Sequence, residues 1–254
     1  KVSKRSWPIE CVEDGFVDID DTVDVELGIH QYWNQTMRDA ERHNLTRITV
    51  RSAFAHSSNV GISKLVEQHY NKDPEKYLSY LRELGLDKKL NIEIPGEQQP
   101  YIKDTKDKRF TRYSLPWMSV GYEIQISPLQ MLTLYNSVAN NGVMMKPYLV
   151  QQIQEYGLPV QHFDPVVLNK KICSDETLQA MKIILKEVVD SGTAKNLRNP
   201  NYSVAGKTGT AQIADKKHGY ATRIYQSSFV GYFPAENPMY SCIVVVNAPS
   251  KGVY

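Results

Sequence analysis

The sequence lacks any apolar run close to the roughly 20 residues that a helix needs to cross a bilayer. Its longest uninterrupted apolar stretch lies around Ile243 to Val246, which is the length of a buried strand. Neither end shows the charged, then apolar, then small-residue pattern of a secretory signal. We therefore expect any targeting element to lie outside these 254 residues.

Cysteine is scarce, with only three residues, Cys11, Cys173 and Cys242. They are far apart in the sequence, and no pair has the C-x-x-C spacing of a zinc site or a redox motif. We expect three reduced thiols, buried as small apolar side chains usually are. The sequence thus indicates no metal site, no disulfide framework and no cofactor.

The sequence also lacks a large excess of charge of either sign. It has 30 Lys and Arg residues and 28 Asp and Glu residues, which gives a net charge of +2. Nucleic-acid binding needs a concentrated basic face, so we expect no nucleic-acid partner. With 41% hydrophobic residues, the chain is long enough for one large domain or two closely packed subdomains.

The first two thirds of the sequence carry helix signals. One helix is predicted from about Thr49 to Ser57, and another follows directly after Ser57-Ser58-Asn59 with apolar residues at helical spacing. Capping residues predict three more helices, which begin at Asp73-Pro74, Ser127-Pro128-Leu129-Gln130 and Ser174-Asp175-Glu176. Residues 1–46 are expected to form loops with short elements, and the basic charges between Lys103 and Arg112 to form a solvated loop face.

In the last third, the helical spacing of apolar residues gives way to short segments rich in Val, Ile, Tyr and Phe. These segments predict three strands, over residues 203–213, 227–233 and 240–246. A short connection between the last two favours an antiparallel pair. Helices followed by consecutive strands predict an α+β fold, with an antiparallel sheet flanked by helices and an all-α subdomain. We place the helical subdomain at roughly residues 47–200 and the sheet strands at residues 201–254.

Two short motifs carry the chemistry. Ser57-Ser58-Asn59 opens a predicted helix, and Lys207-Thr208-Gly209-Thr210 lies on a predicted strand. Either motif alone is weak, but S-x-N and K-T-G belong with S-x-x-K to the signature set of penicillin-binding proteins and class A β-lactamases. Further matches are Ser58-Asn59-Val60-Gly61-Ile62-Ser63-Lys64-Leu65, Ile94-Pro95-Gly96-Glu97, Ser127-Pro128-Leu129-Gln130 and Lys207-Thr208-Gly209-Thr210-Ala211-Gln212. Over nearly its whole length the chain resembles the transpeptidase domain of class B penicillin-binding proteins.

This resemblance implies a peptidoglycan D,D-transpeptidase with the β-lactamase and transpeptidase fold. Such an enzyme acylates its own serine with a stem peptide ending in D-Ala-D-Ala, releases the last D-Ala and passes the acyl group to an amine. β-Lactam antibiotics mimic the donor and stay attached. The resemblance also implies a place on the periplasmic or extracytoplasmic face of the membrane, a membrane anchor upstream, and cell-wall synthesis partners.

For catalysis, the resemblance assigns proton transfer to Ser57, which would act between the base lysine and the leaving nitrogen. Lys207 would supply a positive charge that favours the neutral form of that base lysine. Lys1 is the candidate for the base lysine itself, and Lys4 is an alternative.

For substrate binding, the resemblance assigns Ser58, Asn59, Thr208, Gly209 and Thr210. Asn59 would offer its amide to the substrate peptide, and the hydroxyls of Thr208 and Thr210 would bind the donor carboxylate. Gly209 would leave room for a substrate strand along the sheet edge. The backbone N–H of Thr210 would be one oxyanion donor.

The nucleophile is missing, because no serine in the sequence is followed by lysine three positions later. Thr105-Lys106-Asp107-Lys108 has this spacing, but it lies in a charged loop after the S-x-N motif, so we reject it. We expect the nucleophile just before Lys1 or in the first few residues, and both ends of the domain to continue beyond this chain. The alternatives are a serine β-lactamase and a non-catalytic β-lactam sensor or degenerate homologue.

Overall fold

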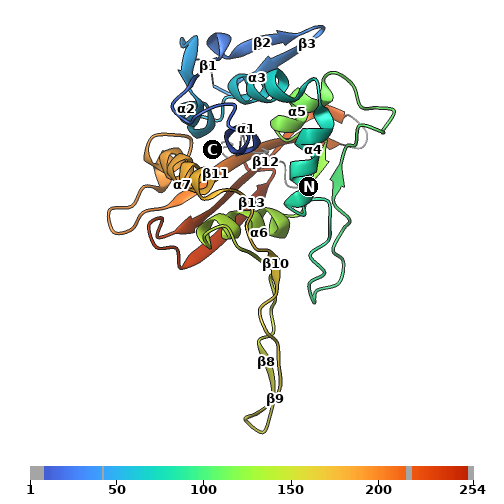
Figure 1. The fold of residues 1–254 in the computed structure, drawn as a ribbon, viewed down its shortest axis with the longest axis vertical. Coiled ribbons are helices and arrows are strands. Elements are labelled where there is room, and N and C mark those ends of the chain that lie inside the picture. Colours follow the sequence, from blue (N-terminus) through green and yellow to red (C-terminus); the bar gives the residue numbers. More distant parts are fainter. Residues whose placement is uncertain (1–8, 42, 216–218, 251–254) are drawn as a thin grey trace.

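The computed structural model describes residues 9–41, 43–215 and 219–250. Figure 1 shows a body of helices and sheet from which one thin arm projects. The helices are α1 (Ile9–Glu13), η1 (Glu26–Gly28), α2 (Val50–Ala55), α3 (Asn59–Tyr70), α4 (Pro74–Glu83), α5 (Ser114–Ser119), α6 (Pro128–Ala139), α7 (Asp175–Asp190) and η2 (Lys195–Leu197). The strands are β1 (Thr22–Asp24), β2 (Ile29–Tyr32), β3 (Gln35–Arg38), β4 (Arg47–Thr49), β5 (Tyr101–Ile102), β6 (Ile124–Gln125), β7 (Met144–Met145), β8 (Gln152–Glu155), β9 (Leu158–His162), β10 (Val167–Asn169), β11 (Ala205–Asp215), β12 (Gly219–Phe233) and β13 (Tyr240–Asn247).

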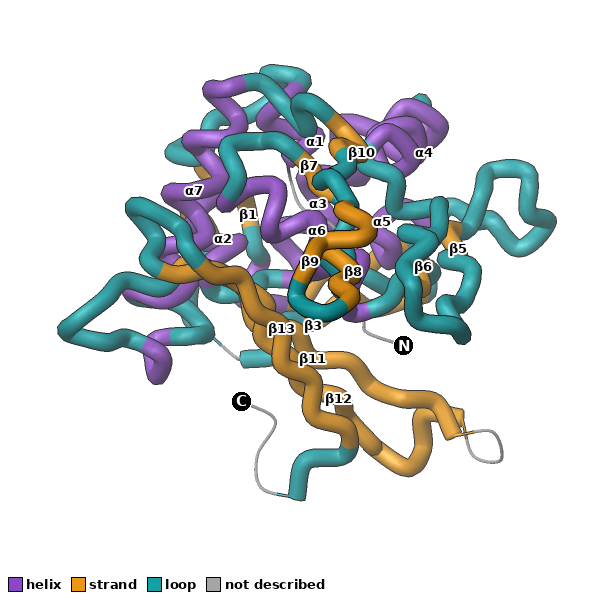
Figure 2. The backbone as a smooth tube through the Cα atoms, turned by 90° about the horizontal axis from the view of Figure 1, so that it is seen from below, coloured by secondary structure: helices purple, strands orange, loops and turns teal. Residues whose placement is uncertain are grey.

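The main sheet is antiparallel, with the strand order β11-β12-β13. The register places Lys207 opposite Val230, and Val230 opposite Ile243. The predicted antiparallel pair at the end of the chain is therefore confirmed, and β11 is an edge strand of the sheet formed by the described residues. The middle strand begins at Gly219, eight residues before the predicted start at residue 227. Figure 2 shows the far ends of β11 and β12 extending beyond the helices.

The helix starts predicted from capping residues are confirmed. The predicted caps Asp73 and Ser174 each accept a hydrogen bond from a backbone N–H in the first turn of the helix that follows. Thr49, where a helix was expected to begin without a predicted cap, does the same for α2. Ser127 and Gln130 form the predicted capping box at the start of α6. These signals were reliable because each cap is satisfied within four residues and needs no distant partner.

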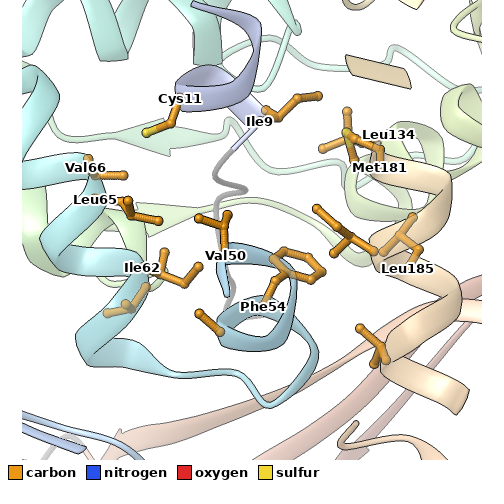
Figure 3. Packing of buried hydrophobic residues seen from close by; sticks show 14 of the residues in the cluster. Ile9, Cys11, Val50, Phe54, Ile62, Leu65, Val66, Leu134, Met181 and Leu185 are labelled. Carbon is orange, nitrogen blue, oxygen red and sulfur yellow. The ribbon is translucent and has the colours of Figure 1, made fainter. Parts of the chain in front are cut away.

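The apolar core lies where the helices meet and extends to the sheet. Figure 3 shows side chains of this core from α1, α2, α3, α6 and α7, and those labelled are Ile9, Cys11, Val50, Phe54, Ile62, Leu65, Val66, Leu134, Met181 and Leu185. Phe54 of α2 is 4% exposed and is one of the core residues nearest to the motif at Ser57. Core packing therefore fixes α2, the helix that directly precedes the turn carrying this motif.

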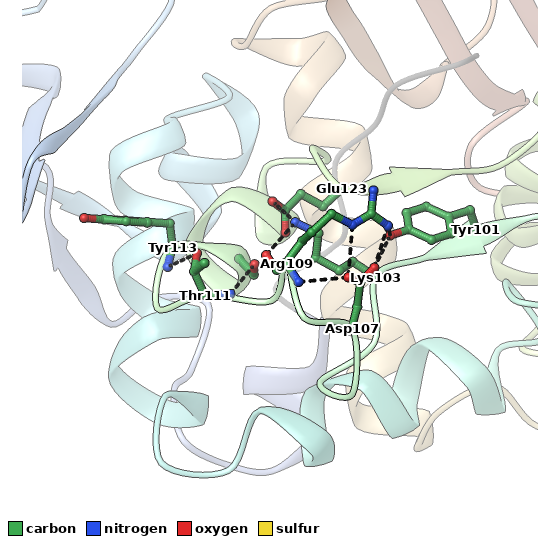
Figure 4. Close-up of polar contacts among 8 residues, drawn as sticks. Tyr101, Lys103, Asp107, Arg109, Thr111, Tyr113 and Glu123 are labelled. Atoms are coloured by element: carbon green, nitrogen blue, oxygen red, sulfur yellow. Dashed lines mark hydrogen bonds and ion pairs between the residues drawn. The ribbon is translucent and has the colours of Figure 1, made fainter.

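The loop between α4 and α5 is held by polar contacts within it and with Glu123, which follows α5 (Figure 4). Lys103 Nζ lies 2.6 Å from Glu123 Oε1, and the Lys103 side chain is only 13% exposed. Arg109, whose side chain is 73% exposed, pairs with Asp107 at 2.6 Å. The prediction of a solvated basic face is thus correct for Arg109 and wrong for Lys103, which Glu123 draws inward across 20 residues of sequence.

Strands β8 and β9 form the arm that projects from the body in Figure 1. Every residue of both strands is exposed, including Leu158 and Val160. This arm lies within residues 47–200, where a purely helical subdomain was expected. In addition, α6 contacts β12 and β13, and α7 contacts β11, so these two helices pack on the sheet. The subdomain boundary itself stays a prediction.

Cys11, Cys173 and Cys242 are free thiols. The first two are buried, as expected, whereas Cys242 is half-buried on β13. None of the helices in the described residues combines the length and the apolar character that a bilayer span requires.

Two carboxylates of the α1 region have shifted pKa values in opposite directions. Burial raises the pKa of Asp14, but hydrogen bonds from Tyr70 and Tyr80, together with the Lys76 ammonium, outweigh it and hold that pKa below its usual value. Glu10 is 1% exposed, and burial raises its pKa from 4.5 to about 8, against a backbone hydrogen bond and with help from the charge of Asp14. Glu10 is therefore protonated in the folded protein at neutral pH.

Glu10 should make folding stability fall as the pH rises. Its folded pKa lies above its unfolded value, so its contribution is fully present below pH 4.5 and is lost as the pH approaches about 8. The slope from this one proton is at most about 1.4 kcal/mol per pH unit. Urea unfolding between pH 5 and pH 8.5 should show this slope in the wild type and a flatter one in Glu10→Gln. The exposed control Glu93→Gln should keep the wild-type slope, and equal slopes in wild type and Glu10→Gln would refute the assignment.

Candidate active site

Ser57 lies in the tight turn between α2 and α3. Its N–H donates to the Phe54 carbonyl at 3.0 Å, and the N–H of Ser58 donates to the Ala53 carbonyl at 2.7 Å. Ser57 has a φ of 59°, in the left-handed region that is uncommon for residues other than glycine. Its side chain is buried at the start of α3 rather than projecting into solvent.

Lys207 comes from the edge strand β11 and meets this turn. Its Nζ donates a hydrogen bond to Ser57 Oγ, although the two residues are 150 positions apart in the sequence. The ammonium also lies 5.6 Å from the centre of the Phe54 ring, and the residue is 3% exposed. A charge so deeply buried is costly unless polar groups surround it, and Ser57 is one such group. The structure therefore brings together two of the three catalytic residues predicted from the sequence.

A third segment, the turn after α7, reaches the same place. Thr193 Oγ1 lies 2.6 Å from Thr208 Oγ1, and Thr208 Oγ1 lies 3.5 Å from Lys207 Nζ. The Thr193 N–H donates to the Ala55 carbonyl at 3.1 Å, which ties this turn to the end of α2. Sequence reasoning missed Thr193, because it belongs to neither of the two motifs.

Gly209 and Thr210 follow on β11, opposite Ser228 and Ser227 of β12. The Gly209 carbonyl accepts a hydrogen bond from Ser228 Oγ at 3.3 Å. Among the residues that the structure describes, the order β11-β12-β13 pairs one edge of β11, the edge that faces β12. Thr208, Gly209 and Thr210 thus lie on a strand whose other edge is paired with no strand in the described part of the chain.

Ser58 and Asn59 interact with the protein itself. The Ser58 hydroxyl donates to Asp39 Oδ2 at 2.8 Å and accepts from the Gly61 N–H at 3.0 Å, which makes Ser58 the N-cap of α3. Asn59 Nδ2 donates to the Arg38 carbonyl at 2.6 Å. Their substrate-binding roles stay predictions. Asp39 was not singled out from the sequence, since it lies in a stretch expected to be irregular.

Two further sequence predictions concern other places. Lys1, and with it the alternative Lys4, lies outside the described residues. Thr105, rejected as a nucleophile, donates its hydroxyl hydrogen to Glu75 Oε2 at 2.9 Å, on α4. It is therefore engaged in the loop between α4 and α5.

The arrangement combines one buried ammonium with several hydroxyls along an edge strand. A cation flanked by hydroxyl donors binds a carboxylate, and a serine hydroxyl bonded to an ammonium can relay a proton. Among residues 9–41, 43–215 and 219–250, no group of three or more His, Cys, Asp or Glu side chains could hold a metal ion. These side chains could therefore bind a carboxylate and relay a proton.

Comparison with known proteins agrees with this chemistry. Residues 11–253 match the family model described as the penicillin binding protein transpeptidase domain. The chain belongs to this family. Penicillin-binding protein PbpB of Mycolicibacterium smegmatis is 30% identical over 262 residues, covering 98% of this chain and 39% of the relative. The peptidoglycan D,D-transpeptidase FtsI homolog of Mesostigma viride is 27% identical, covering 94% of this chain and 41% of the relative.

Solved structures of class B transpeptidase domains share the fold. Penicillin-binding protein 3 of Mycobacterium tuberculosis, in complex with aztreonam, superposes with a TM-score of 0.82 at 26% identity, over 96% of this chain and 55% of that one. The apo transpeptidase domain of Burkholderia pseudomallei penicillin-binding protein 3 gives a TM-score of 0.80 at 25% identity, over 95% and 68%. The expected fold class is confirmed. The chain spans about two fifths of the length of the curated relatives named above.

The Gly192 turn of this transpeptidase domain should not tolerate a side chain. A Cβ at Gly192 would lie 2.3 Å from the Ala55 carbonyl oxygen, so Gly192→Ala must push the turn away from α2. We expect a loss of about 1–3 kcal/mol in the free energy of unfolding, measured with urea. Ser191→Ala, one position earlier and exposed, is the control and should stay within about 0.5 kcal/mol of wild type. Equal stability of the two variants would show that the contact is not rigid.

Proposed function

We propose that this chain is the acyl-transfer domain of a peptidoglycan D,D-transpeptidase that acts on stem peptides ending in D-Ala-D-Ala and is acylated by β-lactams. The observation that carries this proposal is the Lys207 ammonium, buried against the Ser57 hydroxyl beside an edge strand. Acyl transfer from a peptide donor needs a nucleophile, a path for the proton and a way to hold the donor. The buried cation, the serine hydroxyl bonded to it and the edge of β11 support the last two of these roles.

The donor's terminal carboxylate would bind at Lys207, Thr208 and Thr210. The Gly209 carbonyl accepts from Ser228 on the β12 side, and the alternation of a strand then directs the backbone groups of Thr208 and Thr210 to the other edge. A substrate peptide laid along that edge would extend the sheet by one strand. Any side chain at Gly209 would crowd this strand, and the Thr210 N–H would face the developing oxyanion.

Ser57 would carry the proton. The neutral base lysine would first take the proton of the nucleophilic serine as that serine attacks the donor carbonyl. The departing D-Ala nitrogen needs a proton, which the Ser57 hydroxyl would donate while it recovers this one from the base lysine. Lys207 keeps its own proton, and its positive charge favours the neutral form of the base lysine. The hydrogen bond from Lys207 to Ser57 also orients the serine hydroxyl toward the reacting atoms.

None of the serines in the 254 residues has a lysine three positions later, so this proposal assigns the nucleophile to no serine of the given sequence. Its base lysine is Lys1, or Lys4 as the alternative. Because peptidoglycan is assembled outside the cytoplasmic membrane, the domain would work on the extracytoplasmic face, together with other proteins of cell-wall synthesis.

The full-length protein should form a stable covalent adduct with a labelled penicillin, seen as a mass increase of one antibiotic. Lys207→Ala should slow this acylation about 100-fold or more, because the variant lacks the cation that holds Ser57 and the antibiotic carboxylate. Lys170→Ala removes an exposed lysine and should acylate at the wild-type rate. Circular dichroism should show that both variants are folded.

Three results would contradict the proposal. Rapid loss of the adduct would indicate a serine β-lactamase, and a folded full-length protein that forms no adduct would indicate a non-catalytic homologue. Acylation of Lys207→Ala at the wild-type rate would remove Lys207 from the carboxylate site.

A further inference from the structure

The carboxylate of Asp39 is the point at which the S-x-N motif is tied to the rest of the domain. Asp39 follows β3, and its side chain is only 5% exposed. Its Oδ2 accepts from Ser58 Oγ at 2.8 Å, and its Oδ1 accepts from the Val60 N–H at 2.9 Å. The Asp39 side chain thus accepts hydrogen bonds from Ser58, the second residue of the motif, and from the backbone in the first turn of α3.

Asp39 is itself held on the other side. Its N–H donates to the Gly28 carbonyl at 2.9 Å, and His43 Nε2 lies 3.0 Å from Asp39 Oδ2. A Cβ at Gly28 would lie 3.2 Å from both Asp39 Cβ and His43 Nε2, so the missing side chain leaves room for this pair. The carboxylate is therefore fixed in place before it meets the motif.

The residue before Asp39 adds a second contact to the same motif. The Arg38 carbonyl accepts from Asn59 Nδ2 at 2.6 Å. The end of β3 thus binds Ser58, Asn59 and the Val60 N–H in succession. A negative charge close to the first backbone N–H groups of a helix is also stabilised by the helix dipole.

These contacts bear directly on Ser57. Its left-handed φ of 59° costs of order 1 kcal/mol or more, so the surrounding structure must impose it. On its N-terminal side, the Phe54 carbonyl holds the Ser57 N–H. On its C-terminal side, the next residue is Ser58, whose hydroxyl is held by Asp39. If Ser58 were released, the turn would relax and Ser57 Oγ would move away from Lys207.

We propose that Asp39 is a positioning residue, which holds the S-x-N turn so that Ser57 stays in contact with Lys207. It acts through Ser58 and Val60 and does not itself touch the substrate. Its effect on catalysis rests on the proposed transpeptidase function, whereas its effect on the Ser57–Lys207 contact does not.

The test compares Asp39→Asn with Asp73→Asn in the full-length protein. Asp39→Asn keeps the shape of the side chain but removes its charge and sets an N–H group against Ser58 or Val60. Asp73 is the N-cap of α4, where it accepts from the Lys76 N–H, so Asp73→Asn changes a capping carboxylate that is not part of this site. The penicillin acylation rate should fall about 10- to 100-fold in Asp39→Asn and stay within about twofold of wild type in Asp73→Asn.

His43→Ala tests the contact between His43 and Asp39 separately from the contacts of Asp39 with Ser58 and Val60. It removes one partner of Asp39 but leaves the contacts with Ser58 and Val60, so its acylation rate should lie between those of wild type and Asp39→Asn. A crystal structure of Asp39→Asn should show Ser57 Oγ beyond hydrogen-bonding distance of Lys207 Nζ. Thermal melting of each variant measures stability separately from acylation.

The proposal is overturned if Asp39→Asn acylates at the wild-type rate, or if its crystal structure retains the Ser57–Lys207 hydrogen bond. It is also overturned if Asp39→Asn and Asp73→Asn lose acylation equally, in proportion to the unfolded protein, because Asp39 would then be only structural. If the wild-type protein is not acylated at all, the transpeptidase function fails, and the crystal structure alone decides the role of Asp39.

Discussion

The hydrogen bond from the Lys207 ammonium to the Ser57 hydroxyl is the contact on which the site depends. It joins the turn between α2 and α3 to the edge strand of the main sheet. Phe54 packs in the core on one side and faces the ammonium on the other, so core packing and site geometry share a residue. Thr193 joins the same point from the end of α7, through Thr208 and Ala55.

A buried lysine lowers the stability of the folded protein, because removing its charge from water costs free energy that burial of an apolar side chain does not cost. Ser57 adds a left-handed backbone conformation at the same place. We expect two destabilising features in direct contact at a functional site, where residues are kept for catalysis and not for packing. The compensation comes from neighbouring contacts, namely the carboxylate of Asp39, the cap at Ser58 and the carbonyls at the end of α2.

Local signals made most of the fold predictable from the sequence. The caps at Asp73, Ser127 and Ser174 gave the starts of α4, α6 and α7, because each cap is satisfied by near neighbours. The change of period in the last third gave the three strands of the main sheet. The start of β12 was placed too late. The exposed β8–β9 arm was not predicted, and its strands lack the alternation of buried and exposed residues that a core imposes.

The site was predictable only in part, for a similar reason. Ser57 and Lys207 were found because two short motifs could be compared with a known family. Asp39 and Thr193 were missed because their importance comes from contacts with residues 19 and 15 positions away, which no local pattern encodes. Lys103 was misplaced on the surface because its partner Glu123 is equally distant.

The most direct test of the account is a crystal structure of the full-length protein acylated by a penicillin. The account predicts that the antibiotic carboxylate lies within hydrogen-bonding distance of the Thr208 or Thr210 hydroxyl, alongside β11, with Lys207 still bonded to Ser57. A covalent adduct whose carboxylate lies away from β11, or in which Lys207 and Ser57 are apart, would contradict it.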